Sequence, residues 1–378
     1  MVSSSYSFQA HLRERILPTL VRLDGLELGQ RDILGTFDAL VGQDLDFDLR
    51  EGPRFSSNLC EEDCAIELAY TFGSEEDCGV RYSYEPTCRR STLRNRYTLC
   101  RDRFKSTLRR CGPGYDVDRF LELFRRALPN DVLLSTRQDA TATICAVHHY
   151  RDRPPRLKMY FSVDYGSDEQ RALERTRALV GGLEDAALSE QLEAFLGVFE
   201  PLGCGRMVGF DFAANGGVTT KVYKRGTGLS ISGLEQLVRM TEGGGTALAG
   251  LAAFQDIFLD GRRDPALFDL VTLSPSSTGR PRLKLYVRPV ALYGDDEALA
   301  RLRRWYAHLA KVDELALVEQ GLAAVAPLDV LAETRGFFNY FSVDVSREGL
   351  SKTSVYYAPL VPLRHMARTQ PERLTQLR

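Results

Sequence analysis

Lysine and tyrosine recur along this sequence in the spacing Lys-x-Tyr. They occur in "RLKMYF", "TTKVYK" and "PRLKLYV", where Lys158, Lys221 and Lys284 follow one another at intervals of 63 residues. Alternate residues of a β-strand share one face, so each pair places a cation and a phenol side by side. Ammonium groups bind anions, and aromatic faces stabilise neighbouring cations. The pairs therefore predict a site for an anion next to a site for a cation.

Two weaker copies of the motif flank this series. Toward the N-terminus, "VRYSYEP" carries Arg81 in place of the lysine and Ser83 in place of the tyrosine. Toward the C-terminus, "SKTSVYYAPL" places Lys352, Ser354 and Tyr356 on one face. A repeat at a fixed period of this size indicates stacked supersecondary units.

Each copy of the motif lies in the second of two strand-like runs. Short linkers rich in Gly, Pro, Asn and Ser separate the two runs, which is typical of β-hairpins. Hairpins of this kind form antiparallel sheets. We predict five hairpins, near residues 64–86, 141–164, 206–225, 267–288 and 337–358.

The segments between the hairpins have apolar residues three and four positions apart, which predicts helices. These segments are "VDRFLELFRRAL", "SDEQRALERTRALVGGL", "LSEQLEAFLGVFEPL", "SGLEQLVRMTEGGGTALAGLAAF" and "DDEALARLRRWYAHLAKVDELALVEQGLAAV". We therefore expect a single α+β domain over residues 1–378, in which helices and hairpins alternate.

The two faces of these strands must serve different purposes. Helices pack on an apolar sheet face, which Leu157, Met159 and Phe161 supply in the first Lys-x-Tyr strand. The lysines and tyrosines must then point away from the helices. About ten strands are enough to close a barrel, and closure would bring these side chains into one shared interior. We predict such a closed antiparallel barrel, ringed by helices.

Converging cations need an anion among them, because they would otherwise repel one another. A compact, multiply charged anion such as a phosphate or diphosphate suits both arginine forks and lysine ammonium groups. A diphosphate beside a cage of phenols is typical of a site where an allylic diphosphate ionises, with the phenols shielding the allyl cation from water. The predicted cations are Arg81, Lys158, Lys221, Arg282, Lys284 and Lys352, and the predicted phenols are Tyr160, Tyr223, Tyr286 and Tyr356.

The composition argues against several other classes of protein. Apolar residues make up 44% of the 378 residues, charged residues make up 26%, and the net charge is −2. These values indicate a soluble globular protein and argue against nucleic acid as a partner. The N-terminus has no basic region followed by an apolar run, and no segment approaches a membrane span, which needs about 20 apolar residues. We expect a cytoplasmic protein without a membrane partner.

The cysteines do not predict a metal site. Six of the eight cysteines lie between Cys60 and Cys111, but only Cys60 and Cys64 approach the spacing of zinc ligands, and no histidine lies in that stretch. Structural zinc sites need two such pairs of Cys or His ligands. We expect small core residues or incidental thiols, and no bound metal.

The sequence resembles the dimethylallyltryptophan synthase type of aromatic prenyltransferase, which has the ABBA barrel. The resemblance covers roughly residues 60–360 and rests on "AIELAYTFGSEEDCGVRYSYEP", "RLKMYF", "TTKVYKR", "RPRLKLYV" and "SVYY". It implies a ten-strand barrel and transfer of a dimethylallyl group from dimethylallyl diphosphate to an aromatic ring, usually an indole such as tryptophan, in secondary metabolism. It also implies no strict need for Mg2+, and no DDxxD-type motif is present. We expect a monomer or a homodimer.

The resemblance also implies roles for individual residues. The predicted cations would hold the diphosphate, and the predicted phenols would shield the allyl cation. Glu67 would accept a hydrogen bond from the indole N–H, and Arg206 would anchor the carboxylate of tryptophan. Ser162 would line the acceptor site, and His148 is a candidate proton acceptor, although His148 and His149 border a turn and are more typical of exposed loop residues.

The sequence departs from the family pattern at two positions and leaves other functions open. Thr219 replaces an arginine that often precedes Lys-x-Tyr, and Lys352 replaces a frequent tyrosine, so the exact pose of the diphosphate stays open. The same barrel could prenylate a phenol, a tyrosine or a peptide side chain. A non-catalytic barrel that binds an anionic small molecule is the alternative from another class.

Overall fold

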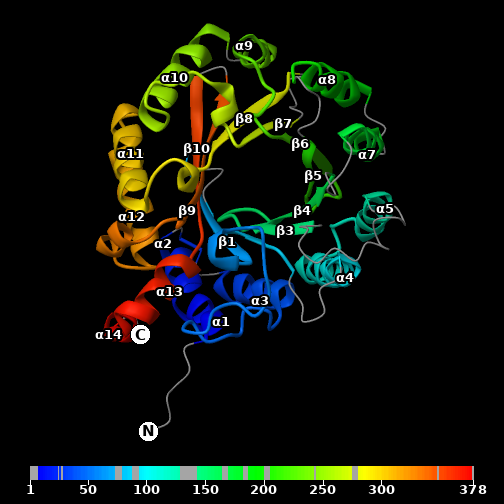
Figure 1. Ribbon diagram of the computed structural model, residues 1–378. Helices are drawn as coiled ribbons and strands as arrows, with labels where there is room; N and C mark the ends of the chain where they lie inside the picture. Colours follow the sequence, from blue (N-terminus) through cyan, green and yellow to red (C-terminus); the bar gives the residue numbers. More distant parts are fainter. Residues whose placement is uncertain are drawn as a thin grey trace.

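A closed barrel of antiparallel strands lies at the centre of the molecule (Figure 1). The computed structural model describes residues 7–23, 25–26, 29–72, 79–86, 93–127, 143–163, 169–181, 186–199, 205–241, 244–274, 280–346 and 349–376. The strands are β1 (Ile66–Phe72), β2 (Arg81–Tyr84), β3 (Thr143–His148), β4 (Arg156–Ser162), β5 (Gly205–Phe212), β6 (Val218–Lys224), β7 (Leu270–Ser274), β8 (Arg282–Val287), β9 (Phe338–Ser346) and β10 (Gly349–Tyr357).

Strands that follow one another in the chain are neighbours in the barrel, and β10 pairs with β1 to close it. Ala69 of β1 thus lies opposite Arg81 of β2 on one side and opposite Tyr356 of β10 on the other. Closure joins the first hairpin to the last. The predicted barrel of ten antiparallel strands is confirmed.

Helices surround the barrel on its outside, as Figure 1 shows. No helix among the described residues is both long and apolar enough to cross a lipid bilayer. The helices are α1 (Phe8–His11), α2 (Leu17–Leu23), α3 (Gln30–Val41), α4 (Leu93–Cys111), α5 (Val117–Ala127), α7 (Glu169–Gly181), α8 (Ala186–Leu196), α9 (Ile231–Met240), α10 (Gly244–Phe258), α11 (Asp295–His308), α12 (Val312–Ala323), α13 (Leu360–Thr369) and α14 (Pro371–Gln376).

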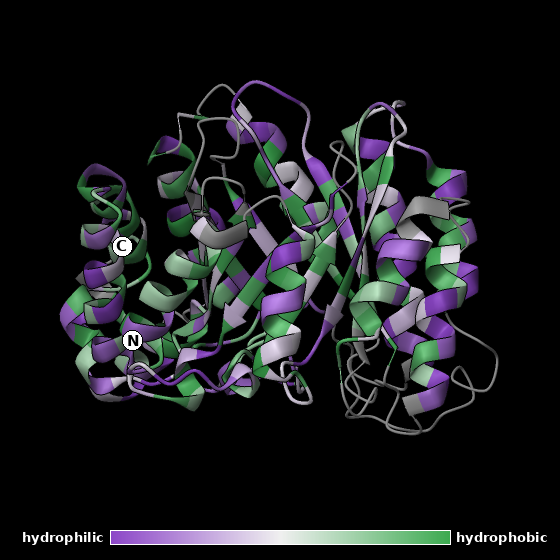
Figure 2. Ribbon diagram, turned by 90° about the horizontal axis from the view of Figure 1, so that it is seen from above, coloured by the Kyte–Doolittle hydropathy of each residue, from purple (hydrophilic) through white to green (hydrophobic). Residues whose placement is uncertain are grey.

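Two separate apolar layers follow from the alternation of each strand. The larger layer lies between strands and helices and includes Leu157, Met159 and Phe161, as predicted. A smaller cluster lies on the inner face and contains the tyrosines of the repeat. Figure 2 shows hydrophilic and hydrophobic residues alternating along the helices, as expected for helices that pack on a sheet with one face only.

The helices differ from the prediction in number and length. Helices α1 to α4, α13 and α14 were not predicted, and the two longest predicted helical segments are each divided into two helices, α9 with α10 and α11 with α12. The division between α11 and α12 falls at Ala310, whose φ of 56° is incompatible with a continuing right-handed helix.

A buried carboxylate fixes the chain just before β9. Asp295, at the start of α11, accepts hydrogen bonds from the backbone N–H groups of Gly336, Phe337 and Phe338 at 3.2, 3.0 and 3.2 Å. The carboxylate thus satisfies three backbone donors that have no partner in the sheet at this point. This fixes the start of the strand that carries Asn339 and Tyr340.

Candidate active site

The inner face of the barrel carries a layer of cations. Each even-numbered strand is the second strand of a hairpin, and each contributes at least one basic side chain to this face. We call this set the cation layer: Arg81, Lys158, Lys221, Lys284 and Lys352. Because the motif recurs on the second strand of each hairpin, its basic residues form a ring of positive charge around the interior.

Two aspartates that the sequence analysis missed lie within the cation layer. Asp211 of β5 is 2% exposed, and its Oδ2 lies 3.3 Å from Lys158 Nζ and 2.9 Å from Lys221 Nζ. Asp344 of β9 has Oδ1 at 3.3 Å from Lys284 Nζ. The expectation that only a bound anion separates these cations is therefore wrong, because the protein supplies part of the negative charge itself.

The pKa values follow from this burial and pairing. Burial acts to raise the pKa of Asp211, but Lys158 and Lys221 more than offset it and lower that pKa well below its usual range. Burial lowers the pKa of Lys158 well below its usual value, and Asp211 offsets only part of that shift. Asp211 is therefore the group that favours the charged form of Lys158, the most buried lysine of the cation layer.

A ring of tyrosines adjoins the cation layer. Along the ring, the centroid distances are 5.7 Å from Tyr160 to Tyr223, 6.3 Å from Tyr223 to Tyr286 and 5.9 Å from Tyr286 to Tyr356. Tyr340 of β9, which was not predicted, lies 6.0 Å from Tyr286 and 6.4 Å from Tyr356. We call these five residues the tyrosine ring. The contacts Tyr160–Tyr223, Tyr286–Tyr340 and Tyr340–Tyr356 are edge to face.

Arg81 connects the two layers. Its guanidinium donates hydrogen bonds to Tyr356 Oη at 3.1 Å and to Tyr160 Oη at 3.2 Å, and it lies 5.1 Å from the centre of the Tyr356 ring. An arginine fork can contact a diphosphate and these phenols together. Arg81 is therefore placed where a leaving diphosphate and an allyl cation would part.

Gly209 of β5 leaves room for two rings of the tyrosine ring. A Cβ there would lie 2.9 Å from Tyr160 Cδ1 and 3.2 Å from Tyr223 Cε2. We expect Gly209→Ala to displace both rings, to lower kcat by about tenfold and to raise the share of donor that is hydrolysed to dimethylallyl alcohol, because the shield opens to water.

The ratio of alcohol to prenylated product, measured by chromatography, checks this prediction. Gly181→Ala is the control, since a Cβ at Gly181 meets nothing within 4 Å. An unchanged ratio for Gly209→Ala would show that the rings do not exclude water.

Glu67 of β1 lies beside the tyrosine ring and is 6% exposed. Asn339 Nδ2 donates a hydrogen bond to Glu67 Oε1, and Ser83 lies opposite Glu67 in the sheet register. Burial raises the pKa of Glu67 to about 7, although the hydrogen bond from Asn339 acts in the opposite direction. Near neutral pH the carboxyl group can therefore either accept or release a proton, which suits a partner for a ring N–H.

This pKa predicts two pH effects. Transfer should become faster as the pH rises through about 7, because the carboxylate is the form that accepts the hydrogen bond. Stability should fall as the pH rises from about 4.5 to about 7, because in this window the unfolded chain has released the proton that the folded protein keeps.

We expect Glu67→Gln to remove both effects and to lower kcat/KM for the acceptor by about tenfold to hundredfold. The pH profiles of kcat/KM and of the midpoint of urea unfolding check the two effects. Glu190→Gln, on the exposed surface of α8, is the control. A profile for Glu67→Gln that still rises through pH 7 would assign the titration to another group.

The remaining predicted residues lie at different places. Ser162 ends β4 on the same face as Lys158 and Tyr160, opposite Met207. Arg282 begins β8 and is exposed, beyond Lys284 on the same face. Arg206 falls at an irregularity of β5 between Gly205 and Met207, and its side chain lies outside the described residues.

His148 and His149 are buried, at 4% and 5% exposure, so the expectation of exposed loop histidines is wrong. His148 lies opposite Arg81 in the sheet register. Burial, and then the cations Lys158 and Arg81, lower its pKa well below the usual value. His148 thus lies beside the cation layer and favours a neutral ring, and its role as proton acceptor stays a prediction.

The cation layer, the tyrosine ring and Glu67 follow one another in this order along the interior of the barrel. Lys284, Tyr286 and Arg288 follow one another on the same face, and Glu67 with Asn339 lies beyond the tyrosine ring from the cation layer. Such an interior can bind a polyanion, stabilise a neighbouring carbocation and hold an N–H group on the far side.

Comparisons with known proteins agree with this chemistry. The sequence profile of a family described as tryptophan dimethylallyltransferase matches residues 28–315. No curated protein matches the chain.

Solved structures with the same fold are similar over nearly their whole length. A 6-dimethylallyl tryptophan synthase is 17% identical with a TM-score of 0.76, covering 94% of this chain and 97% of that chain. The 5-dimethylallyl tryptophan synthase of Streptomyces coelicolor, solved with DMASPP and Trp, is 18% identical with a TM-score of 0.74, covering 94% and 96%. The 6-dimethylallyltryptophan synthase of Micromonospora olivasterospora, also solved with DMASPP and Trp, is 18% identical with a TM-score of 0.75, covering 94% and 98%.

Proposed function

Because this chain belongs to the tryptophan dimethylallyltransferase family and is therefore a prenyltransferase, we propose that it transfers the dimethylallyl group of dimethylallyl diphosphate to the indole ring of tryptophan. The observation that carries the proposal is Arg81, whose guanidinium joins the cation layer to two phenols of the tyrosine ring. This arrangement suits a substrate that separates into a polyanion and a carbocation.

The cation layer binds the diphosphate. In the proposed reaction the C–O bond of the donor breaks, and the diphosphate leaves with the electron pair. Fixed positive charges stabilise that leaving group without reorganising during the reaction. They act where a divalent metal ion would otherwise offset the negative charge, so we expect transfer without added Mg2+. Arg282 and Lys352 extend this charge toward the end of the barrel at which β8 begins.

The tyrosine ring holds the allyl cation and keeps water away from it. The indole then attacks the cation, and a bond forms between the ring and the dimethylallyl group. A base, for which His148 is the predicted candidate, takes the proton from the attacked ring atom. Glu67 accepts a hydrogen bond from the indole N–H, which raises the electron density of the ring. Ser162 lines the acceptor site, and Arg206 remains a predicted partner of the substrate carboxylate.

The test is incubation with dimethylallyl diphosphate and L-tryptophan, without added Mg2+ and again with a chelator. Mass analysis should show a gain of one dimethylallyl unit on tryptophan under both conditions. If a phenol or tyrosine gives product and no indole does, the acceptor is a phenol and not an indole. Tight binding of diphosphate without product from any acceptor would favour a non-catalytic barrel.

A further inference from the structure

A buried ion pair that the proposed reaction does not use lies between the first hairpin and α4. Glu85 directly follows β2, Arg96 lies in α4, and Glu85 Oε1 is 3.6 Å from Arg96 Nη1. The two side chains are only 2% and 3% exposed. Arg96 Nη2 also donates to the carbonyl of Ser56 at 3.0 Å. A buried ion pair contributes little more to stability than apolar residues of similar volume would, so its main effect is on the groups that it holds.

The pair holds a short segment, residues 56–59, through hydrogen bonds to the Glu85 carboxylate. Glu85 Oε2 accepts from Ser57 Oγ at 2.6 Å and from the backbone N–H of Asn58 at 2.9 Å. Ser57 Oγ in turn accepts from the backbone N–H of Leu59 at 3.2 Å. Hydrogen bonds to a buried carboxylate are stronger than those to a neutral acceptor. The conformation of the 56–59 segment therefore depends on the charge of Glu85.

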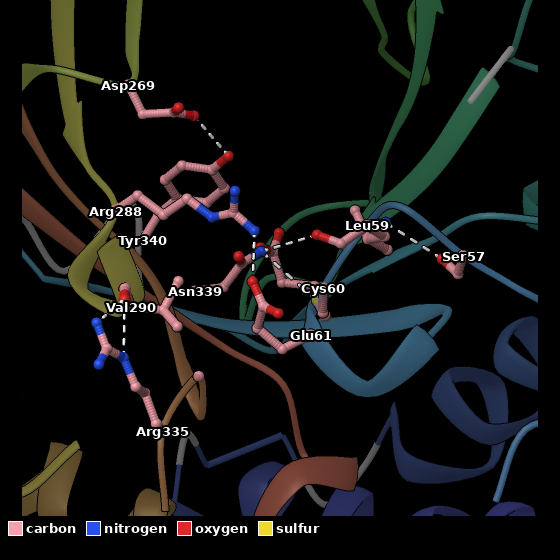
Figure 3. Close-up of polar contacts among 12 residues, drawn as sticks. Ser57, Leu59, Cys60, Glu61, Asp269, Arg288, Val290, Arg335, Asn339 and Tyr340 are labelled. Carbon is pink, nitrogen blue, oxygen red and sulfur yellow. Dashed lines mark hydrogen bonds and ion pairs between the residues drawn. The ribbon is translucent and has the colours of Figure 1, made fainter. Parts of the chain in front are cut away.

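The last carbonyl of this segment fixes the direction of the Asn339 amide. Asn339 Nδ2 donates one hydrogen bond to the Leu59 carbonyl at 3.0 Å and one to Glu67 Oε1. Figure 3 shows dashed lines that join Ser57 to Leu59 and Leu59 to Asn339. An amide nitrogen carries two hydrogens, and the amide oxygen carries none. If the amide turned over, its oxygen would face two other oxygens, so Asn339 is held as a donor to Glu67.

The backbone around Asn339 is held independently of the 56–59 segment. Asp295 accepts hydrogen bonds from the three backbone N–H groups that precede Asn339, and the Asn339 side chain is 1% exposed. Asp295 thus fixes where Asn339 lies, whereas the Leu59 carbonyl fixes which way its amide points.

The hydrogen bond from Asn339 acts on the charge of Glu67. A bond donated to a carboxylate favours the charged form, and this bond opposes the effect of burial on Glu67. Loss of the bond would therefore raise the pKa of Glu67 above its value of about 7. Any group that directs the amide controls the pH at which Glu67 becomes a carboxylate.

Arg81, Cys60 and Tyr356 are the other titratable groups that face Glu67 in the described part of the chain. Arg81 also favours the carboxylate. Burial raises the pKa of the Cys60 thiol well above its usual value, so this thiol stays neutral. Burial acts to raise the pKa of Tyr356, but Arg81 and then Lys284 lower it to about 8. A Glu67→Gln background separates any titration of Tyr356 from that of Glu67.

We propose that Glu85 positions Glu67 for the transfer reaction. With Arg96 it fixes the carbonyl of Leu59. That carbonyl directs the Asn339 amide, and the amide holds the carboxylate of Glu67. Glu85 and Asn339 are thus positioning residues that act through Glu67. The proposal rests on the proposed function and extends it to an ion pair that no sequence motif marks.

Three variants interrupt this series of contacts at different points. Asn339→Leu removes the donor to Glu67, and Glu85→Gln removes the charge that holds the 56–59 segment. Ser57→Ala removes the hydroxyl between Glu85 and Leu59 and leaves no buried charge without its partner, so it keeps the test valid if Glu85→Gln does not fold. For each variant, kcat/KM for L-tryptophan and the midpoint of urea unfolding are measured against pH. The Kd of inorganic diphosphate reports on the cation layer.

We expect Asn339→Leu to move the midpoint of the rise in kcat/KM from about 7 to higher pH by about one unit, because the carboxylate loses a charge-assisted hydrogen bond. At pH 7 this shift lowers kcat/KM by about fivefold. Glu85→Gln and Ser57→Ala should move the midpoint in the same direction by less, with the Kd of diphosphate within about twofold of the wild type. The pH range in which stability falls should extend upward by the same amounts.

The double variant tests whether Glu85 acts through Asn339. In the Asn339→Leu background, Glu85→Gln should move the midpoint no further, because the contact through which it acts is already lost. In the Glu67→Gln background, neither substitution should move any midpoint that remains.

Asp44→Asn is the matched control. It breaks another largely buried pair on α4, in which Asp44 Oδ1 lies 2.8 Å from Arg103 Nη2, and this pair makes no contact with the 56–59 segment. The control should lower the free energy of unfolding and leave the midpoint of the pH profile unchanged.

Three outcomes would overturn the proposal. Unmoved midpoints for Glu85→Gln and Ser57→Ala, beside a moved midpoint for Asn339→Leu, would show that the segment does not direct the amide. Additive shifts in the double variant would give Glu85 an effect independent of Asn339. A shift for Asp44→Asn as large as that for Glu85→Gln would indicate an effect on the fold as a whole. The unfolding profile needs no substrate, so absence of transfer with the expected shifts in that profile would count against the proposed function and support the positioning.

Discussion

Replacing Arg81 with glutamine is expected to lower kcat/KM for dimethylallyl diphosphate by about 10²–10³. Arg81 is the one cation that the structure joins directly to two phenols, Tyr160 and Tyr356, among the described residues. Glutamine removes the positive charge and the fork, so the diphosphate loses a charge-assisted donor while the departing charge develops. Steady-state kinetics and the Kd of inorganic diphosphate measure the loss.

Two further variants separate charge from geometry. Arg81→Lys keeps the charge without the fork, and its kcat/KM should lie between those of the wild type and Arg81→Gln. Arg94→Gln, on the exposed surface of α4, should behave as the wild type. If Arg81→Gln changes kcat/KM by less than about threefold, the donor does not lie against Arg81.

Replacing Asp211 with asparagine is expected to lower the free energy of unfolding by about 3–5 kcal/mol. The substitution leaves the buried Lys158 and the half-buried Lys221 beside each other without their shared carboxylate. Inorganic diphosphate should then stabilise the variant more than it stabilises the wild type, because the anion restores the missing negative charge and binds only the folded protein. Urea unfolding with and without diphosphate measures both effects.

The pH dependence gives a second check on Asp211. Its pKa in the folded protein is lowered, so its contribution to stability is present above the usual pKa of about 3.9 and is lost as the pH falls below that value. In Asp211→Asn the free energy of unfolding should therefore fall less steeply at acidic pH than it does in the wild type. Asp256→Asn, which breaks an exposed pair with Arg263, should cost no more than about 1 kcal/mol. A loss for Asp211→Asn as small as that of the control would contradict the prediction.

The repeat made the barrel predictable. Lys158, Lys221 and Lys284 recur at one period, and the apolar residues between them must face the helices, so the inner face follows from alternation alone. The cations and the four predicted tyrosines accordingly lie on the inner face. No comparable repeat marks α1 to α4, and the many charged residues of α4 obscure its helical pattern.

The two aspartates and the tyrosine that the sequence analysis missed lie on first strands of hairpins. Asp211, Asp344 and Tyr340 sit on β5 and β9, whereas the motif marks only the second strands. Their partners depend on strand register: Asp211 faces Lys158 across one pair of strands, and Asp344 faces Lys284 across another. Register between neighbouring hairpins is set by packing over the whole barrel, and turn signals specify it only within a hairpin. Alternation within "GFDF" and "FSVDV" was the available signal, since it places both aspartates on the inner face.

Because β1 pairs with β10, the site contains residues from both ends of the barrel sequence and is complete only when all strands are in place. Arg81 meets Tyr356 across 275 positions, and Thr71 meets Ser354 across 283. Contacts between such distant segments must wait for the intervening chain to be ordered, which slows folding. During synthesis the donor site therefore cannot form when the first hairpins leave the ribosome. It forms in a late step, when the last hairpin enters the remaining gap, and we expect acquisition of diphosphate binding on refolding to lag behind acquisition of helical structure.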